Sequence, residues 1–362
     1  MLTETVLTAG DGAMHLWDLR TGTALSGYKV AGPSCRAGCL ALGRTTVRGG
    51  AARAGVMYAA QADKAMMHVY QFERDQPFIK FTLPEPCAAL AVSHSGAYCA
   101  MGTERGRIYV WEVSSGALLR GFDAHFKAIS ALRFTLDDAA LVTGSADATV
   151  KVWLMSGVVS LDQPDAPIPL HVWSDHSLPV TDVQCTASSF SGARVVTVSL
   201  DHTCKIWSLA TGQQLLTLLF PVALSACRMH PNETTLFVGG RDGIVYQADL
   251  YRRRDAAGHL LETAGQASAA GSSAAVEGVA LPGARTGQPG KLFRGHGGAI
   301  TGLDVSMDGS LLVTASEDAT AKVWDVASHQ LLRTFTQHKG TSGDGRVDDA
   351  SLYSADGDVG GT

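Results

Sequence analysis

The chain has 362 residues, of which 46% are hydrophobic and 17% charged, a balance typical of a globular protein. Its net charge of −5 provides no global basic field of the kind that attracts nucleic acids. The seven cysteines, at positions 35, 39, 87, 99, 185, 204 and 227, form no CxxC pair, which favours a reducing compartment such as the cytosol or the nucleus. No charged segment with an apolar core opens the chain, and no apolar run reaches about 18 residues, so we expect neither secretion nor a membrane span.

The first three units of the chain predict β-strands without a full repeat signature. In the first unit we expect strands at 5–7 and 16–18 around a turn at 10–12, and another from 24. In the second we expect strands at 56–60 and 67–70, after a Gly/Arg-rich stretch at 43–55 that predicts a loop. In the third we expect strands at 90–92, 98–101 and 108–111, with Arg105 where other units carry a turn Asp.

The stretch 125–153 reads as two apolar runs, a polar turn and an alternating strand, and its register returns at 176–207 and 296–324. In each copy a Thr lies four residues before the turn Asp, and a Trp lies six residues after it. The three quartets are His125/Thr143/Asp147/Trp153, His176/Thr197/Asp201/Trp207 and His296/Thr314/Asp318/Trp324.

These quartets resemble the structural tetrad of WD repeats, and Trp324-Asp325 is a complete WD dipeptide. A repeat of about 40 residues with this signature is one four-stranded blade of a β-propeller. Trp17, Tyr70, Trp111, Trp153, Trp207, Gln247 and Trp324 are taken as equivalent positions. The resemblance therefore predicts an all-β, seven-bladed WD-repeat propeller that forms a single domain over 1–357, with a disordered tail at 358–362.

The first unit lacks its innermost strand, and the end of the chain offers a candidate. Segment 346–357, RVDDASLYSADG, resembles 299–309, AITGLDVSMDG, with Val347 matching Ile300 and Leu352 matching Val305. We expect the C-terminal segment to complete the N-terminal blade and close the ring, because closure removes open sheet edges.

Two segments predict excursions from the blades. The stretch 161–173, LDQPDAPIPLHVW, has three prolines, which disfavour central strand pairing and indicate a protruding loop. The stretch 252–290 is rich in Ala, Gly and Ser and buries too little apolar surface to order itself, so we expect a flexible insertion with a short helix near Leu260.

No constellation for catalysis, cofactor binding or metal binding emerges from the sequence. The quartets superficially resemble a hydrolase triad, but their threefold recurrence beside Trp indicates buried structural hydrogen bonds. The remaining histidines lack metal-ligand spacing, and 287–292 has a Gly-Lys pair without the Ser/Thr of a phosphate loop. The basic run 252–254 could touch RNA phosphate, but the start of a solvated loop is the favoured interpretation. The Gly/Arg stretch carries no aromatic neighbours that would favour stacking on bases. We expect a protein that is not an enzyme, with no cofactor and no metal.

Three stretches are more particular than the repeat requires: AAQADKA at 59–65 followed by MHVY, GTERGRIYVWE at 102–112 followed by SGALL, and DHSLPVTD at 175–182. Together they resemble the WD-repeat subunit family of the nuclear complex that matures the large ribosomal subunit precursor. The resemblance implies a non-catalytic scaffold that works with two helical-repeat subunits, the pre-60S particle and the AAA ATPase midasin. It also implies a role in removal of the second internal transcribed spacer, a nucleolar or nucleoplasmic location, and at most indirect contact with RNA.

Other readings stay open. The family usually continues into a C-terminal helical segment that assists assembly, whereas this sequence stops at Thr362, which leaves dimerisation and stoichiometry open. A WD-repeat adaptor of another assembly, such as a ubiquitin-ligase substrate receptor or a chromatin reader, is the main alternative, and an enzyme is the third. The partner-binding residues are unknown; exposure alone favours the top-face loops and the Pro-rich loop 162–173.

Overall fold

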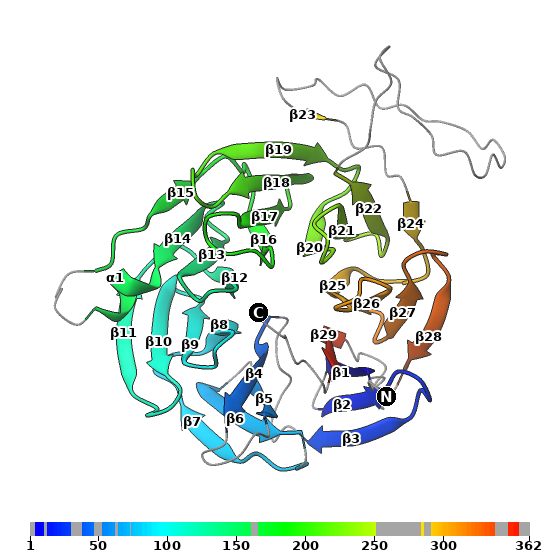
Figure 1. The fold of residues 1–362 in the computed structure, drawn as a ribbon, viewed down its shortest axis with the longest axis horizontal. Helices are drawn as coiled ribbons and strands as arrows, with labels where there is room; N and C mark the ends of the chain where they lie inside the picture. The colour runs from blue at the N-terminus through cyan, green and yellow to red at the C-terminus, as the bar shows by residue number, and fades with distance from the viewer. Residues whose placement is uncertain are drawn as a thin grey trace, which may run out of the picture.

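A computed structural model describes residues 4–10, 13–29, 38–46, 53–61, 64–72, 74–160, 166–250, 284–285, 291–336 and 347–354. Within these residues the strands form seven sheets, six of four strands and one of five, arranged around a central axis (Figure 1). The prediction of an all-β, seven-bladed propeller is confirmed.

The blades are numbered in chain order, with strands given from the innermost outward. Blade 1 has β29 (Val347–Ser354), β1 (Glu4–Gly10), β2 (Ala13–Asp18) and β3 (Ala24–Lys29). Blade 2 has β4 (Leu40–Thr46), β5 (Arg53–Ala60), β6 (Met66–Gln71) and β7 (Ile79–Thr82). Blade 3 has β8 (Cys87–Val92), β9 (Tyr98–Thr103), β10 (Arg107–Glu112) and β11 (Leu118–Asp123).

Blade 4 has β12 (Ile129–Phe134), β13 (Ala140–Ser145), β14 (Val150–Leu154), the helix α1 (Met155–Val159) and β15 (His171–Trp173). Blade 5 has β16 (Val180–Cys185), β17 (Arg194–Ser199), β18 (Thr203–Ser208), β19 (Gln214–Leu219) and the short β23 (Ala284–Arg285). Blade 6 has β20 (Leu224–Met229), β21 (Thr235–Gly240), β22 (Val245–Asp249) and β24 (Lys291–Phe293). Blade 7 has β25 (Ile300–Val305), β26 (Leu311–Ser316), β27 (Ala321–Asp325) and β28 (Leu331–Phe335).

Aromatic contacts join neighbouring blades towards the perimeter. At five blade interfaces, a ring near the end of one outermost strand packs on the ring at the Trp position of the next blade, with centroids 4.5 to 5.9 Å apart. The pairs are Phe335/Trp17, Tyr28/Tyr70, Phe122/Trp153, Trp173/Trp207 and Phe293/Trp324. Aromatic pairs add stabilisation beyond the area they bury, so the outer strands end on aromatic residues for a packing reason.

A second set of contacts joins the blades near the axis. At four interfaces, a hydroxyl in one innermost strand donates to the carbonyl of the first residue of the next innermost strand, at 2.5 to 3.0 Å. The pairs are Ser130/Val180, Thr181/Leu224, Ser225/Ile300 and Thr301/Val347. We call these contacts axial clasps; they hold blades 4, 5, 6, 7 and 1 in sequence.

The ring closes between β1 and β29, as the sequence predicts. Val6 pairs with Leu352 and Gly10 with Val347, with a register shift before the last pair. Blade 7 repeats this arrangement, since Leu312 pairs with Val305 and Ser316 with Ile300. The predicted matches of Val347 with Ile300 and of Leu352 with Val305 therefore hold residue by residue.

Two predictions are wrong, one about the stretch 43–55 and one about the Trp position of blade 6. The stretch 43–55 is not a loop at its ends, because Arg44 pairs with Gly55 and Thr46 with Arg53 in a β4–β5 hairpin. The sequence predicts a loop because the stretch has few apolar side chains. Strand pairing is made by backbone hydrogen bonds, however, which residues without apolar side chains also form. In blade 6, Ala248 and not Gln247 occupies the Trp position, since Leu236 pairs with Ala248 as Leu141 pairs with Trp153.

The predicted excursions differ in outcome. Residues 171–173 at the end of the Pro-rich stretch form β15, the outermost strand of blade 4, so only the part before them can be a loop. Within the insertion, Ala284 and Arg285 pair in parallel with β19. The expected helix near Leu260, the basic run 252–254 and the tail 358–362 lie outside the described residues.

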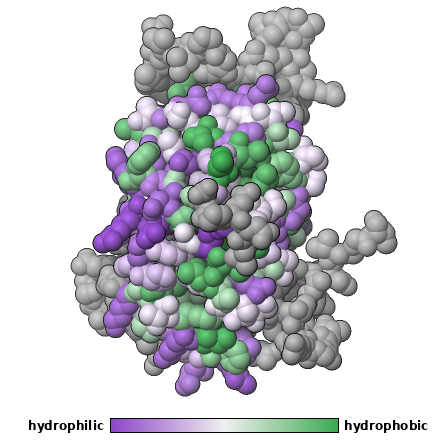
Figure 2. Space-filling model, turned by 90° about the vertical axis from the view of Figure 1, so that its left-hand side faces the viewer, coloured by the Kyte–Doolittle hydropathy of each residue, from purple (hydrophilic) through white to green (hydrophobic). Residues whose placement is uncertain are grey.

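Apolar side chains also face outward at the edge of the ring. Figure 2 looks at the edge formed by β11, α1 and the neighbouring outer strands, and shows hydrophobic residues gathered in groups among polar ones. Ile79, Leu118, Ile168 and Val172 are exposed large hydrophobic residues of these outer segments. The edge of the ring therefore offers apolar surface that the packing of the blades does not use.

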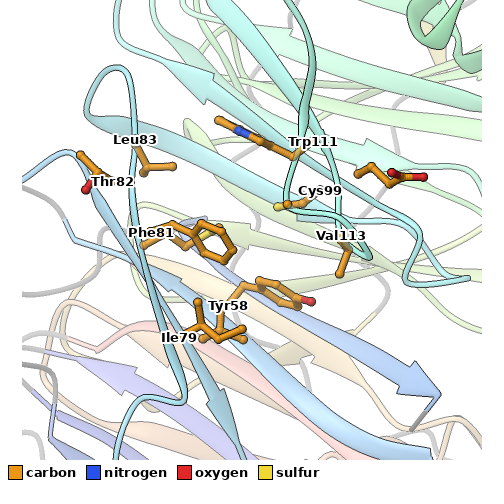
Figure 3. Close-up of a pocket in the computed structure, with 12 residues that line it drawn as sticks. Tyr58, Ile79, Phe81, Thr82, Leu83, Cys99, Trp111 and Val113 are labelled. Atoms are coloured by element: carbon orange, nitrogen blue, oxygen red, sulfur yellow. The ribbon is translucent and has the colours of Figure 1, made fainter. Parts of the chain in front are cut away.

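The interface between blades 2 and 3 is packed differently from the others. Phe81 stands where Phe122 stands in blade 3, and Trp111 is the next Trp position, but the two rings line a cavity of about 80 Å³ together with Tyr58 and Cys99 (Figure 3). Perimeter packing is thus incomplete at this one of the described interfaces.

Removing residues 347–362 takes β29 away and leaves β1 with an unpaired edge. We expect the melting temperature to fall by several degrees and the protein to self-associate, because open edges template pairing with other chains. Circular dichroism and light scattering test this, with a chain lacking only 355–362 as the control that keeps β29. A monomer with an unchanged melting temperature would contradict the role given to this pairing.

Candidate functional site: the quartets and the loops they hold

The structure brings the four residues of each quartet into one hydrogen-bond chain. In blade 4, Trp153 Nε1 donates to Thr143 Oγ1 at 3.1 Å, and Thr143 Oγ1 lies 2.8 Å from His125 Nε2. His125 Nδ1 lies 3.1 Å from Asp147 Oδ2. An indole N–H only donates and a carboxylate only accepts, so the chain runs from Trp through Thr and a neutral His to Asp.

The same geometry recurs in blades 5 and 7. The corresponding distances from Trp to Thr, Thr to His and His to Asp are 3.0, 2.9 and 2.9 Å for Trp207/Thr197/His176/Asp201. They are 3.0, 2.7 and 2.9 Å for Trp324/Thr314/His296/Asp318. Each predicted site residue thus contacts the partners assigned to it, and the three quartets lie in three separate blades.

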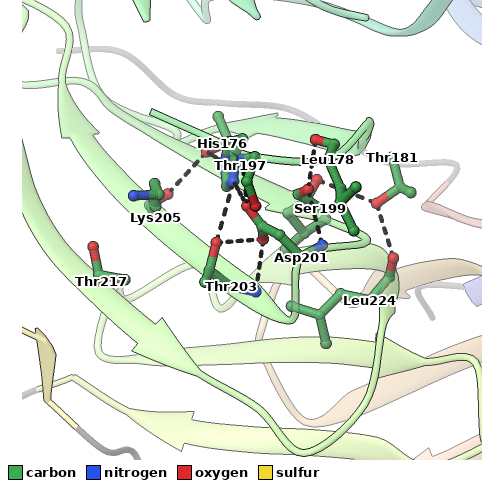
Figure 4. A network of polar contacts seen from close by, with 12 residues as sticks. His176, Leu178, Thr181, Thr197, Ser199, Asp201, Thr203, Lys205, Thr217 and Leu224 are labelled. Carbon is green, nitrogen blue, oxygen red and sulfur yellow. Dashed lines mark hydrogen bonds and ion pairs between the residues drawn. The ribbon is translucent and has the colours of Figure 1, made fainter. Parts of the chain in front are cut away.

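The aspartate is the centre of each network, as Figure 4 shows for blade 5. Besides His176, Asp201 accepts hydrogen bonds from the Ser177 amide at 3.1 Å, the Thr203 amide at 2.9 Å and the Thr203 hydroxyl at 2.5 Å. One carboxylate therefore joins the loop before the innermost strand to the turn between the second and third strands.

Burial and hydrogen bonding set the charge states of the quartets. Burial lowers the pKa of His125 and of His296, which keeps both imidazoles neutral near pH 7. Burial also acts to raise the pKa of Asp147, Asp201 and Asp318, but the hydrogen bonds donated to them outweigh it, so each pKa lies below its ordinary value. Neutral histidines beside ionised aspartates fit the donor directions of the chain.

The quartets cannot act as hydrolase triads. A nucleophile must be open to substrate, whereas Thr143, Thr197 and Thr314 are all 0% exposed and already accept an indole N–H. Among the described residues, no group of three or more His, Cys, Asp or Glu side chains could hold a metal ion. The chemistry of the quartets is structural: they hold loops in place.

Two related contacts escaped the sequence analysis. In blade 1, Trp17 Nε1 donates to Thr8 Oγ1 at 2.8 Å, although Thr8 lies only three residues before Asp11 because this turn is one residue shorter. In blade 6, where Val238 replaces the Thr, the Tyr246 hydroxyl donates to the turn Asp242 at 2.7 Å. Blade 1 therefore keeps the Trp–Thr bond of a quartet, and blade 6 holds its turn Asp through a Tyr hydroxyl instead of a His.

The loops that the quartets hold carry exposed apolar side chains. Phe126, directly after the quartet His of blade 4, is 94% exposed while its amide donates to Asp147 at 3.1 Å. Leu178 in the equivalent loop of blade 5 is 47% exposed. An almost fully exposed aromatic side chain whose backbone is held by a hydrogen bond is a candidate anchor for a partner protein. We call the loops at 125–128 and 176–179 the quartet face.

The opposite face has a hollow at the mouth of the central channel, with a volume of about 430 Å³. Arg228 Nη2 lies 2.8 Å from Asp304 Oδ1, and Arg133 Nη2 lies 3.7 Å from Asp182 Oδ1, so the charges at this mouth are paired. Met307, 76% exposed, stands at its rim. Paired charges give this hollow no strong attraction for a small ion.

Comparison with known proteins agrees with the geometry. The family model described as WD domain, G-beta repeat matches residues 116–153, 167–208 and 287–325. These ranges contain the three inner strands of blades 4, 5 and 7 with their quartet Trp residues, each preceded by the outermost strand of the blade before. WD repeat-containing protein 18 of Bos taurus is 36% identical over 330 residues, covering 89% of this chain and 66% of the relative. Its Danio rerio counterpart is 34% identical over 343 residues, covering 93% and 71%.

A third relative, Pre-rRNA-processing protein IPI3 of Yarrowia lipolytica, is 33% identical over 286 residues, covering 78% of this chain and 62% of the relative. The chain spans about two thirds of the length of these relatives. The fold and the three matched repeats define a protein of the WD-repeat propeller class. Within that class, the chain belongs to the family of WD repeat-containing protein 18.

The described part of the chain has no helix long and apolar enough to cross a membrane; its one helix, α1, has five residues.

Replacing Asp201 by Ala should lower the free energy of unfolding by about 1–3 kcal/mol, because it leaves buried donors without an acceptor. Urea denaturation measures the change. Asp175→Ala is the matched control: it removes an exposed carboxylate next to His176, in the loop before β16, and should have little effect. Equal stability of the two variants would refute the structural role of the quartet.

The propeller should lose stability as the pH falls from about 7.5 to about 5. The folded-state pKa of His125 and of His296 lies below the ordinary value of 6.5, so below that pH the unfolded chain binds protons that the folded chain does not. The depressed pKa values of the quartet aspartates add a further loss below their ordinary value of 3.8. Melting temperatures across this range test the sign, and His125→Asn, which removes one of these buried imidazoles, should flatten the slope.

Proposed function

We propose that the chain is a non-catalytic scaffold subunit of a nuclear complex that acts in large ribosomal subunit maturation and pre-rRNA spacer processing. The observation that carries the proposal is its 33% identity, over 78% of the chain, to a relative named as a pre-rRNA-processing protein. A second relative of that name, from Mycosarcoma maydis, is 31% identical over 58% of the chain.

The architecture supports a scaffold role because the surfaces it displays are held rigidly. Axial clasps and aromatic pairs fix the blades to one another, and the quartets pin the loops between blades. A subunit that positions partners needs such fixed spacing, whereas none of the quartets exposes a reactive group. The family resemblance adds two helical-repeat subunits, the pre-60S particle and the AAA ATPase midasin as proposed partners, with a nuclear location.

The quartet face is the surface we assign to a helical-repeat subunit. Phe126 and Leu178 project from adjacent blades, and an exposed aromatic beside an aliphatic side chain suits the apolar stripe of a partner helix. With a net charge of −5, contact with RNA is expected to be indirect.

Affinity purification of the tagged chain from nuclear extract, with mass spectrometry of its partners, tests the function. We expect two helical-repeat subunits, midasin and large-subunit assembly factors. Recovery of cullin-type ligase subunits or histones without pre-ribosomal proteins would replace the proposal by a WD-repeat adaptor of another assembly.

Phe126→Ala should reduce recovery of a helical-repeat partner by about 10-fold or more, since truncating a central aromatic anchor typically costs this much binding. Its melting temperature should not change, because the side chain is 94% exposed and the bond of its amide to Asp147 remains. Met307→Ala, at an exposed position of the opposite face, is the matched control. Normal recovery with Phe126→Ala would place the contact elsewhere and leave the function itself untouched.

A further inference from the structure

The interface between blades 2 and 3 lacks the aromatic pair that joins the blades at five other described interfaces. Blade 3 has Met101 and Arg105 where a quartet has Thr and Asp, and blade 2 has Ala59 in the Thr place. At the perimeter, Phe81 and Trp111 line a cavity of about 80 Å³. The contact at the inner end of this interface is therefore of particular interest.

Two cysteines meet at this inner end. Cys39, directly before β4 of blade 2, and Cys87, the first residue of β8 of blade 3, have their sulfur atoms 3.8 Å apart. Both residues are 0% exposed. The backbone holds them together, because the Leu90 amide donates to the Gly38 carbonyl at 2.8 Å across the same interface.

The pair makes a contact like an axial clasp: Cys87 stands at the accepting position, and Cys39 stands one residue after the donor position, where blade 4 has Ala131. The Cys39 thiol points at the Cys87 carbonyl at 3.6 Å, as the Ser130 hydroxyl points at the Val180 carbonyl between blades 4 and 5. At the described clasps of the other blades the donor is Ser or Thr and the accepting residue is Val, Leu or Ile. Only here, among the described clasps, is sulfur present on both sides, and an S–H is a weak donor.

We propose that Cys39 and Cys87 form a thiol modification site, in which an intramolecular disulfide joins the innermost strands of blades 2 and 3. The sulfur atoms are in van der Waals contact, and bond formation requires them to move from 3.8 Å to about 2 Å. The covalent bond replaces a weak thiol contact at an interface that has no perimeter aromatic pair.

The reaction is thiol–disulfide exchange with a small-molecule disulfide such as oxidised glutathione. The thiolate of one cysteine attacks a glutathione sulfur, which forms a mixed disulfide and releases one glutathione thiolate. The second cysteine thiolate then attacks the protein sulfur and releases the second glutathione. The two protein thiols lose two protons and two electrons, and one oxidised glutathione becomes two reduced glutathione molecules.

The other described cysteines are poor competitors. Burial raises the pKa of Cys99 and of Cys185 to about 12 and also raises the pKa of Cys204 and of Cys227, which keeps these thiols protonated. No sulfur–sulfur contact between them accompanies this burial in the described residues. The pair is therefore singled out by geometry.

The test incubates the full chain with oxidised glutathione in sub-denaturing urea, which opens the blades transiently, and then maps disulfides by mass spectrometry without reduction. We expect a cross-linked peptide containing Cys39 and Cys87, together with a melting temperature several degrees above that of the reduced chain, since a disulfide that closes a long loop restricts the unfolded state. Reduction with dithiothreitol should reverse both changes.

Two conservative variants serve as matched controls. Cys39→Ser keeps a small donor that can point at the Cys87 carbonyl, and Cys87→Val introduces the residue that blade 5 has at this position, Val180, so both should fold and neither should gain thermal stability on oxidation. Free or merely glutathionylated Cys39 and Cys87 in the treated wild-type chain, or a cross-link between other cysteines, would overturn the proposal. An equal gain in stability in Cys39→Ser would overturn it as well.

Discussion

The propeller depends on contacts that set the angle between one blade and the next. Between blades 4 and 5, the Ser130 hydroxyl near the axis reaches the first carbonyl of the next innermost strand, and the Trp173/Trp207 pair joins the same two blades at the perimeter. Figure 4 shows the equivalent Thr181 contact from blade 5 to blade 6. Two contacts at different distances from the axis fix both spacing and tilt. Seven such steps must add up to a full circle, so an error at one interface strains all of the others.

The quartets act on a shorter scale than these inter-blade contacts. They do not appear in blades 3 and 6, where Met101 or Val238 replaces the Thr, and those blades still pair their strands in the same register. What the quartets add is a hydrogen bond from the amide that follows the His to the Asp, which holds the backbone of that loop in place. Blades 4, 5 and 7, which carry them, are consequently the blades whose loops present a constant shape to another molecule.

The local features of the fold could be predicted from sequence, and the contacts between distant segments could not. Alternating apolar residues and the spacing of Asp and Trp located the strands, and the match of Val347 to Ile300 located the closing strand, because these patterns follow from the geometry of one blade. Ala248 was missed because neither Ala248 nor its neighbour Gln247 is aromatic, so no side chain in the sequence identified the Trp position of blade 6. The meeting of Cys39 with Cys87 joins different blades, and no periodicity within one repeat encodes it.

Pairing of β1 with β29 joins residues up to 350 positions apart, because Glu4 lies opposite Ser354. During synthesis β1 therefore waits for the six other blades to be made before its neighbour exists. Contacts of such long sequence separation form late and slowly during folding. Blade 1 is thus the first blade begun and the last completed, and until then the nascent chain is an open arc with an exposed strand that a chaperone or a binding partner can cover.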